Sequence, residues 1–118
     1  MAVKKLQNAY YVTAGMDRAV AFYRDVLGLP LKFQDGERWA QFDAGGVNFS
    51  LSAPDEAATG ARGAVVIFEV DDLDAARDRL VDARASVLET RDMGTHGRLL
   101  TFQDPDGNLV QLFQRAPA

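Results

Sequence analysis

An internal repeat is the feature that most restricts how this chain can fold. Residues 6–54 contain a strand-like stretch, an amphipathic helical pattern and three more strand-like stretches, and residues 62–115 repeat that order. Met16 aligns with Leu73 and Tyr23 with Leu80 at a common offset of 57 residues, so the apolar phase also repeats. A shared element order and apolar phase indicate an internal duplication. We therefore predict an α+β fold of two tandem βαβββ modules.

The individual elements follow from periodicity and from turn residues. Apolar residues at three- and four-residue spacing predict a first helix over Met16–Leu27, which Gly28 ends. The second helix is predicted to begin at Leu73, with Asp71 or Asp72 as its N-cap. Asp104–Gly107 has the composition of a tight turn. Strands are predicted at residues 9–13, 31–34, 38–43, 47–52, 64–70, 86–90, 98–103 and 109–114.

Composition excludes several classes of protein. The 118 residues fit a single domain and include no cysteine, which excludes disulfides and cysteine-based metal sites. A formal net charge of −4 argues against a nucleic-acid partner, because phosphate binding needs a cationic surface. No apolar run is long enough to span a bilayer, and the first residues do not form a signal peptide. We expect a cytoplasmic protein without a membrane partner.

The predicted architecture has a consequence for ligand binding. Two curled sheets, each backed by one helix, leave two concave faces, and modules placed edge to edge would line a trough. We therefore expect a small-molecule ligand there. A trough without any ligand is the third alternative, beside the two functions weighed below.

Four segments together resemble one known family. They are Ala21–Leu29 (AFYRDVLGL), Ala44–Gly46, Phe68–Ala75 and Thr101–Leu112 (TFQDPDGNLVQL). With these segments the chain resembles the vicinal oxygen chelate superfamily, which has glyoxalase, bleomycin-resistance and ring-cleaving dioxygenase branches. The resemblance implies curled sheets around a trough and a homodimer. It leaves open whether the modules pair within one chain or exchange between two.

The same resemblance implies a divalent metal, whose ligands would fall on Asn8, Ser50, Val65 and Gln111. These residues supply no carboxylate and no imidazole, which are the usual donors to catalytic transition metals. A shift of one residue does not restore a donor. We therefore predict no metal and no cofactor, as in the bleomycin-resistance-like branch.

Strand parity extends this set into a candidate ligand-binding site. Tyr10 shares a face with Asn8, Asn48 with Ser50, and Phe113 with Gln111. Phe113 and Leu109, which both share the face of Gln111, are favoured as residues that fill a closed core. Trp39, with Phe33 and Phe42, offers a stacking surface, although ordinary packing is the more common role of such residues.

Two ionisable residues complete the candidate site. The Glu69 carboxylate either faces the trough or lies in solvent at the end of its strand, and the sequence favours neither alternative. His96 is the only histidine; a solvated loop residue is favoured over a general base, and ligand contact requires the loop to fold over the trough.

Two functions follow from these residues. The first is a metal-free binding protein that sequesters an antibiotic or a similar amphipathic molecule in a homodimer. The alternative is a glyoxalase-, lyase- or dioxygenase-type enzyme with a displaced metal site or metal-independent chemistry, which would recruit His96, Glu69 or Asp43. The residues at the ligand positions favour the first.

Overall fold

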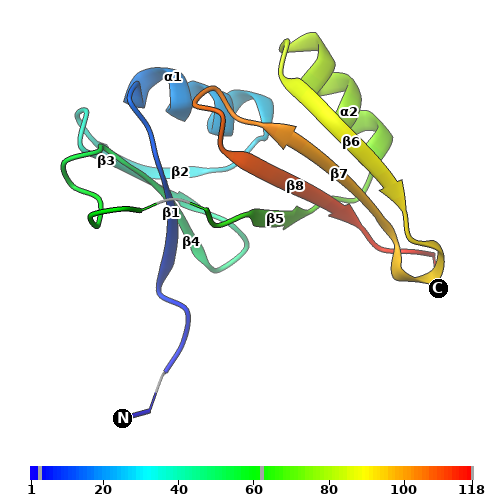
Figure 1. Cartoon of the computed structure of the whole chain (residues 1–118), viewed down its shortest axis with the longest axis horizontal. Helices are drawn as coiled ribbons and strands as arrows, with labels where there is room; N and C mark the ends of the chain where they lie inside the picture. Colours follow the sequence, from blue (N-terminus) through cyan, green and yellow to red (C-terminus); the bar gives the residue numbers. More distant parts are fainter. Residues whose placement is uncertain (3, 62, 118) are drawn as a thin grey trace. The chain divides into compact units, whose positions relative to one another are not determined.

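The computed structural model describes residues 1–2, 4–61 and 63–117, and these residues form two compact units. The first unit spans Met1–Arg62 and the second Gly63–Ala118. Each unit contains one four-stranded sheet and a helix that lies against one face of that sheet (Figure 1). None of the described helices is both long and apolar enough to cross a membrane.

In the first unit the last strand of the sequence lies next to the first. The sheet has the order β1-β4-β3-β2, in which β1 and β4 are parallel and the other neighbours are antiparallel. The elements are β1 Asn8–Val12, α1 Met16–Ala21, η1 Phe22–Val26, β2 Leu31–Asp35, β3 Trp39–Asp43 and β4 Asn48–Ser52.

The second unit repeats this topology. Its sheet has the order β5-β8-β7-β6. As in the first unit, the first and last strands, β5 and β8, are parallel neighbours, and the other neighbouring strands are antiparallel. The elements are β5 Val66–Glu69, α2 Leu73–Asp82, β6 Ser86–Asp92, η2 Gly94–His96, β7 Arg98–Gln103 and β8 Leu109–Gln114. The predicted α+β fold with two βαβββ modules is therefore confirmed.

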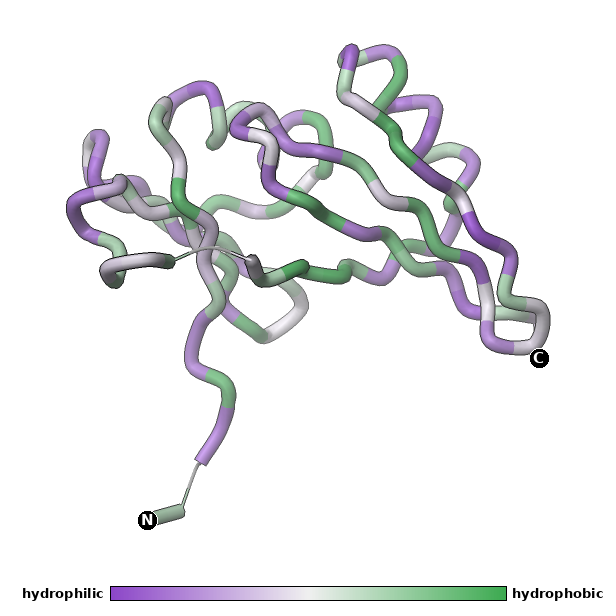
Figure 2. Tube along the Cα trace, in the orientation of Figure 1, coloured by the Kyte–Doolittle hydropathy of each residue, from purple (hydrophilic) through white to green (hydrophobic). Residues whose placement is uncertain are grey.

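Alternating side chains place the core of the first unit between α1 and its sheet. Hydrophobic and hydrophilic residues alternate along the strands (Figure 2). The ring of Tyr23 lies 4.9 Å from that of Phe49 and 6.1 Å from that of Phe42, and all three side chains are buried. The suggestion that Phe42 offers a stacking surface to a ligand was therefore wrong, because Phe42 lies on the helix side of the sheet.

The first helix departs from the predicted Met16–Leu27 α-helix. Its second half, η1, is a π-helix in which the backbone N–H of Leu27 donates to the carbonyl oxygen of Phe22 at 3.2 Å. Two consecutive aromatic residues at the start of η1, Phe22 and Tyr23, are both buried, with ring centroids 5.4 Å apart. An apolar period of three and four residues cannot report a π-helical turn.

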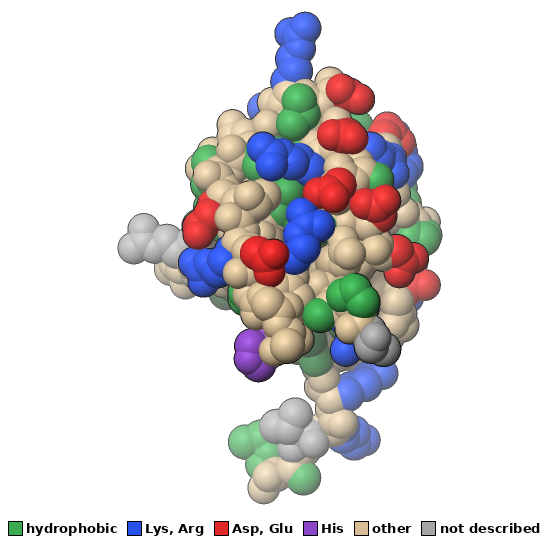
Figure 3. Space-filling view, turned by 90° about the vertical axis from the view of Figure 1, so that its right-hand side faces the viewer, with side chains coloured by type: hydrophobic (Ala, Val, Ile, Leu, Met, Phe, Trp, Pro, Cys, Tyr) green, Lys and Arg blue, Asp and Glu red, His purple; other side chains and the backbone are tan. Residues whose placement is uncertain are grey.

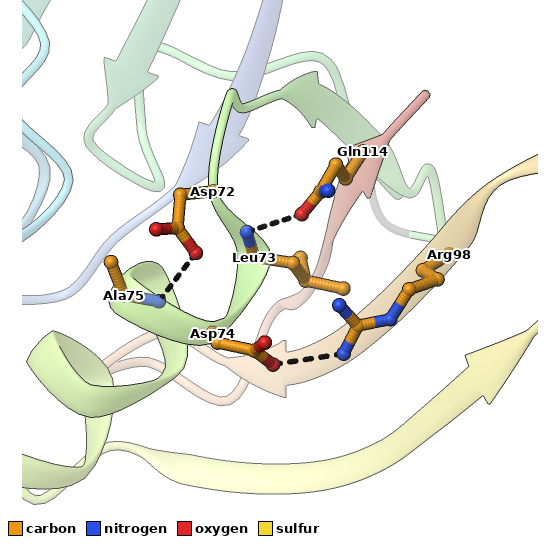
Figure 4. Close-up of polar contacts among 6 residues, drawn as sticks. All are labelled: Asp72, Leu73, Asp74, Ala75, Arg98 and Gln114. Carbon is orange, nitrogen blue, oxygen red and sulfur yellow. Dashed lines mark hydrogen bonds and ion pairs between the residues drawn. The ribbon is translucent and has the colours of Figure 1, made fainter. Parts of the chain in front are cut away.

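Three side-chain contacts fix the start of α2 (Figure 4). Asp72, one of the two predicted caps, accepts a hydrogen bond from the backbone N–H of Ala75 at 3.0 Å. The side-chain oxygen of Gln114, on β8, accepts the N–H of Leu73 at 2.7 Å. Arg98, on β7, donates to Asp74 at 2.8 Å, and this hydrogen bond lowers the pKa of the Asp74 carboxyl. The helix is thus held at its first turn by both inner strands of its sheet.

Two turns in the second unit depend on backbone geometry. The Asp104–Gly107 turn is present as predicted, and the buried Asp104 carboxylate accepts the N–H groups of Asp106 and Asn108, each at 2.9 Å. Gly97 has a φ of 94°, and a Cβ atom there would lie 2.4 Å from the backbone oxygen of Gln114. Only glycine fits at this approach of β7 to the end of β8.

Candidate functional site

The face of the first sheet opposite α1 carries most of the candidate residues of the first unit, and we call it the polar face. Side chains at paired positions of neighbouring strands point to the same side of a sheet. Tyr10 of β1 pairs with Ser50 of β4, which pairs with Gln41 of β3. The side chains that the register of the four strands assigns to the polar face are Asn8, Tyr10, Val12, Phe33, Asp35, Trp39, Gln41, Asp43, Asn48, Ser50 and Ser52.

Four of these side chains form a hydrogen-bonded network across three strands. The Ser50 hydroxyl donates to Oδ1 of Asn8 at 2.9 Å. Asn8 Nδ2 donates to Oε1 of Gln41 at 3.3 Å, and the same oxygen accepts the indole N–H of Trp39 at 3.2 Å. Ser50 is fully buried, whereas the other three are half-buried. The network therefore presents amide and indole groups and uses the serine hydroxyl to orient Asn8.

An aromatic pair lies beside this network. The rings of Tyr10 and Trp39 are 5.5 Å apart with an angle of 60° between their planes. The Tyr10 hydroxyl accepts a hydrogen bond from the backbone N–H of Ala58 at 2.9 Å. Tyr10 thus fastens the segment that follows β4 to the polar face and contributes an aromatic surface there.

Asn48 belongs to the polar face but not to the network. Its side chain accepts a hydrogen bond from Lys32 Nζ at 3.0 Å and donates to the backbone oxygen of Gln7 at 3.2 Å. Both contacts tie Asn48 to neighbouring chain segments. Asp43, in the same row of the sheet, is exposed and accepts the backbone N–H of Gly46 at 2.8 Å.

The remaining strand residues lie in the second unit, on the face of its sheet opposite α2. Gln111 pairs with Ile67 and with Thr101, and its amide donates to the Thr101 hydroxyl at 3.1 Å. Phe113, two residues along β8, shares this face and is half-buried. Leu109, also on this face, is 41% exposed, so the closed-core reading does not hold for Leu109.

The two ionisable candidates are on the surface of the second unit. Glu69 shares the face of Gln111 and accepts a hydrogen bond from Arg115 at 2.8 Å, in an exposed ion pair. His96 ends the short turn η2 and is exposed. Figure 3 shows the histidine on the surface of a face where acidic and basic side chains are interspersed.

The residues at the metal positions do not suit a metal ion. The sheet register places Tyr10 opposite Ser50 and Ile67 opposite Gln111, which makes Asn8 and Val65 equivalent in the two repeats. Val65 precedes β5 and is 44% exposed. Within residues 1–2, 4–61 and 63–117, no group of three or more His, Asp or Glu side chains is placed to hold a metal ion. A neutral set of amides, a hydroxyl and a valine is a poor donor set for zinc, nickel, manganese or iron.

Sequence reasoning missed the residue at the centre of the network. Gln41 accepts from both Asn8 and Trp39, yet glutamine in a short strand carries no motif. Its parity with Trp39 was the available signal, because residues two apart on a strand share a face. Thr101, the partner of Gln111, was missed for the same reason.

The comparison with known families agrees with this architecture. The model described as "Glyoxalase/Bleomycin resistance protein/Dioxygenase superfamily" matches residues 5–112. This chain belongs to that superfamily. The metallothiol transferase FosB of Shouchella clausii is 32% identical to it over 93% of this chain and 80% of the relative.

Two solved structures have a similar fold. The antibiotic binding protein TnmS3 from Streptomyces sp. CB03234 is 28% identical, with a TM-score of 0.72 over 98% of this chain and 99% of that one. The lactoylglutathione lyase from Agrobacterium tumefaciens has a TM-score of 0.79 at 23% identity, over 97% and 96% of the two chains. Proteins with a similar fold therefore include an antibiotic binding protein and a lactoylglutathione lyase.

Proposed function

We propose that this protein binds a small planar molecule on the polar face of its first unit, without a metal and without making or breaking a bond. The observation that carries the proposal is the network of Ser50, Asn8, Gln41 and Trp39 beside the ring of Tyr10. Reversible ligand sites combine apolar and aromatic surface with a few fixed polar groups, and on this face Tyr10, Trp39 and Val12 supply the aromatic and apolar part. Affinity would come from stacking, apolar burial and neutral hydrogen bonds.

The likeness to an antibiotic binding protein at 28% identity supports this class of function. An antibiotic or another amphipathic molecule is accordingly the proposed ligand. The second candidate function is an enzyme with a displaced metal site or metal-independent chemistry, and it draws support from the 32% identity to a metallothiol transferase. The neutral residues at the metal positions favour binding over metal-dependent catalysis.

A titration followed by nuclear magnetic resonance tests the proposed site. Coumarin, indole and proflavine serve as planar probes, and cyclohexanol serves as the non-planar control. We expect at least one planar probe to shift the signals of the Trp39 indole and the Asn8 and Gln41 side-chain amides, with no comparable shift from cyclohexanol. Trp39→Ala should weaken this binding by about tenfold, because one aromatic contact is worth roughly 0.5–1.5 kcal/mol beyond its buried area.

Val81→Ala is the matched control, because Val81 is an exposed apolar residue on α2. It should leave the affinity unchanged. The proposal is overturned if no planar probe shifts these signals at millimolar concentration, or if Trp39→Ala binds the probe as tightly as the native protein.

A further inference from the structure

The direction of every hydrogen bond in the network follows from one group. The indole N–H of Trp39 can only donate. The Gln41 side-chain atom 3.2 Å from it is therefore the oxygen Oε1, and the amide nitrogen Nε2 must point elsewhere. Trp39 thus fixes which end of the Gln41 amide faces the network.

The same reasoning passes from Gln41 to Asn8 and Ser50. Because Gln41 presents an oxygen, the Asn8 atom 3.3 Å from it is the donor Nδ2. Asn8 Oδ1 is then turned toward Ser50, whose hydroxyl donates to it at 2.9 Å. Each amide has a single orientation that satisfies all three contacts.

This orientation directs the donor end of the Gln41 amide, rather than its acceptor oxygen, away from the network and toward a ligand. Both lone pairs of Gln41 Oε1 are used, whereas no atom of the described residues accepts a hydrogen bond from its Nε2. Every buried side-chain nitrogen and oxygen in the described part of the chain has a partner, so Nε2 reaches solvent. It therefore offers two N–H groups on the polar face.

Tyr10 adds a further donor in the same row of the sheet. Its hydroxyl already accepts the N–H of Ala58, so its own hydrogen remains available. Tyr10 and Gln41 lie on either side of Ser50, two strands apart, which is about 10 Å between their backbones.

From this arrangement we infer that the polar face selects planar ligands that carry hydrogen-bond acceptors, such as ring carbonyl oxygens, over planar ligands that carry only donors. The inference rests on the proposed function and specifies its ligand class. A donor-only ligand would face the N–H groups of Gln41 and leave both sides unpaired. The net charge of −4 attracts cationic ligands at long range. At contact distance, however, the N–H donors of the polar face favour ligands that carry hydrogen-bond acceptors.

Coumarin and indole form a matched pair of probes for this test. Both are neutral and bicyclic, but coumarin carries only acceptors and indole carries only a donor. We expect the native protein to bind coumarin about fivefold more tightly than indole, since one well-placed hydrogen bond is worth about 1 kcal/mol. The shift of the Gln41 side-chain amide signals reports binding at the site itself.

Gln41→Glu replaces the hydrogen-bond donor that faces the ligand with an acceptor while keeping the network. A carboxylate still accepts the N–H groups of Trp39 and Asn8, but it replaces the outward NH₂ with an acceptor oxygen. We expect coumarin to lose about tenfold in affinity and indole to gain, so that the preference is inverted. Ala75→Glu, which adds the same charge on the exposed surface of α2, should leave the preference intact.

Trp39→Phe provides a second variant that keeps an aromatic ring. Without the indole donor the Gln41 amide is free to turn, so the preference for coumarin should fall toward unity. Equal binding of coumarin and indole by the native protein, or a preference that survives Gln41→Glu, overturns the inference and leaves the proposed function standing. Failure of every planar probe to bind overturns both.

Discussion

The side-chain oxygen of Gln114 lies 2.7 Å from the backbone nitrogen of Leu73, so the final strand of the second unit caps the helix of that unit. Gln114→Leu keeps the volume but removes the acceptor from the first turn of α2. We expect the free energy of unfolding to fall by about 1 kcal/mol, as for the loss of one hydrogen bond to a backbone donor. Urea unfolding followed by circular dichroism measures it.

Gln103→Leu is the control for this prediction. Gln103 is a half-buried glutamine on the neighbouring strand β7, and its side chain has no hydrogen bond among the described residues. Gln103→Leu should lower the free energy of unfolding by less than half as much as Gln114→Leu does. Equal losses in the two variants would mean that the cap contributes nothing of its own.

Gly97→Ala and Gly107→Ala separate steric overlap from backbone strain. Both glycines have a positive φ, 94° and 83°, but only at Gly97 would the added methyl group meet other atoms, the nearest of them the Gln114 oxygen at 2.4 Å. We expect Gly107→Ala to cost about 1 kcal/mol and Gly97→Ala at least about 3 kcal/mol. Thermal unfolding gives the melting temperature of each variant. Similar melting temperatures for the two variants would contradict the close approach of Gly97 to the Gln114 backbone oxygen.

Gln111→Leu tests the expectation from strand parity that the Gln111 amide contacts a ligand. If the Gln111 amide contacts ligand, coumarin should bind about three- to tenfold more weakly, while the melting temperature changes little. Thr101→Val is the matched control, because it removes the partner of the amide but keeps the amide itself. An unchanged affinity in Gln111→Leu would remove Gln111 from the site.

Metal analysis of protein purified without chelators distinguishes the two candidate functions. We expect nickel, zinc, manganese and iron each well below one ion per chain, because Asn8, Ser50, Val65 and Gln111 offer no anionic or imidazole donor. Mass spectrometry of the acidified protein gives the content. A near-stoichiometric transition metal would favour the enzyme.

Sedimentation equilibrium tests the expected homodimer. In the described part of the chain, β2 and β6 each end a sheet with one neighbouring strand, and edge strands commonly associate with another chain. We expect a mass of twice the 12.9 kDa of one chain. A sedimenting mass of one chain across micromolar concentrations would exclude a stable dimer.

The fold was predictable because its signals are local. Alternation marked the strands, and the repeat of Met16 and Tyr23 at Leu73 and Leu80 indicated that the second half repeats the order of elements of the first. The π-helical end of the first helix was not predictable, because burying Phe22 beside Tyr23 depends on packing against the sheet. Such packing has no signature in the spacing of apolar residues.

The candidate site was predictable only as faces of strands. Parity correctly grouped Asn8 with Tyr10 and Phe113 with Gln111. The hydrogen-bond partners of Asn8 and Glu69 could not be predicted, because they are distant in the sequence. Asn8 and Gln41 are 33 residues apart, and Glu69 and Arg115 are 46 residues apart. Hydrogen-bond direction, on which the ligand class depends, is defined only once these partners are known.

The position of β8 inside its sheet has a consequence for folding during synthesis. Because β8 lies between β5 and β7, a nascent second unit without β8 consists of a lone strand and a separate β6–β7 hairpin. The parallel β5–β8 pairing joins segments on either side of the helix and the hairpin, and such non-local pairing forms slowly. This unit should therefore complete its core only after β8 has left the ribosome, whereas the first unit can fold while the second is still being translated.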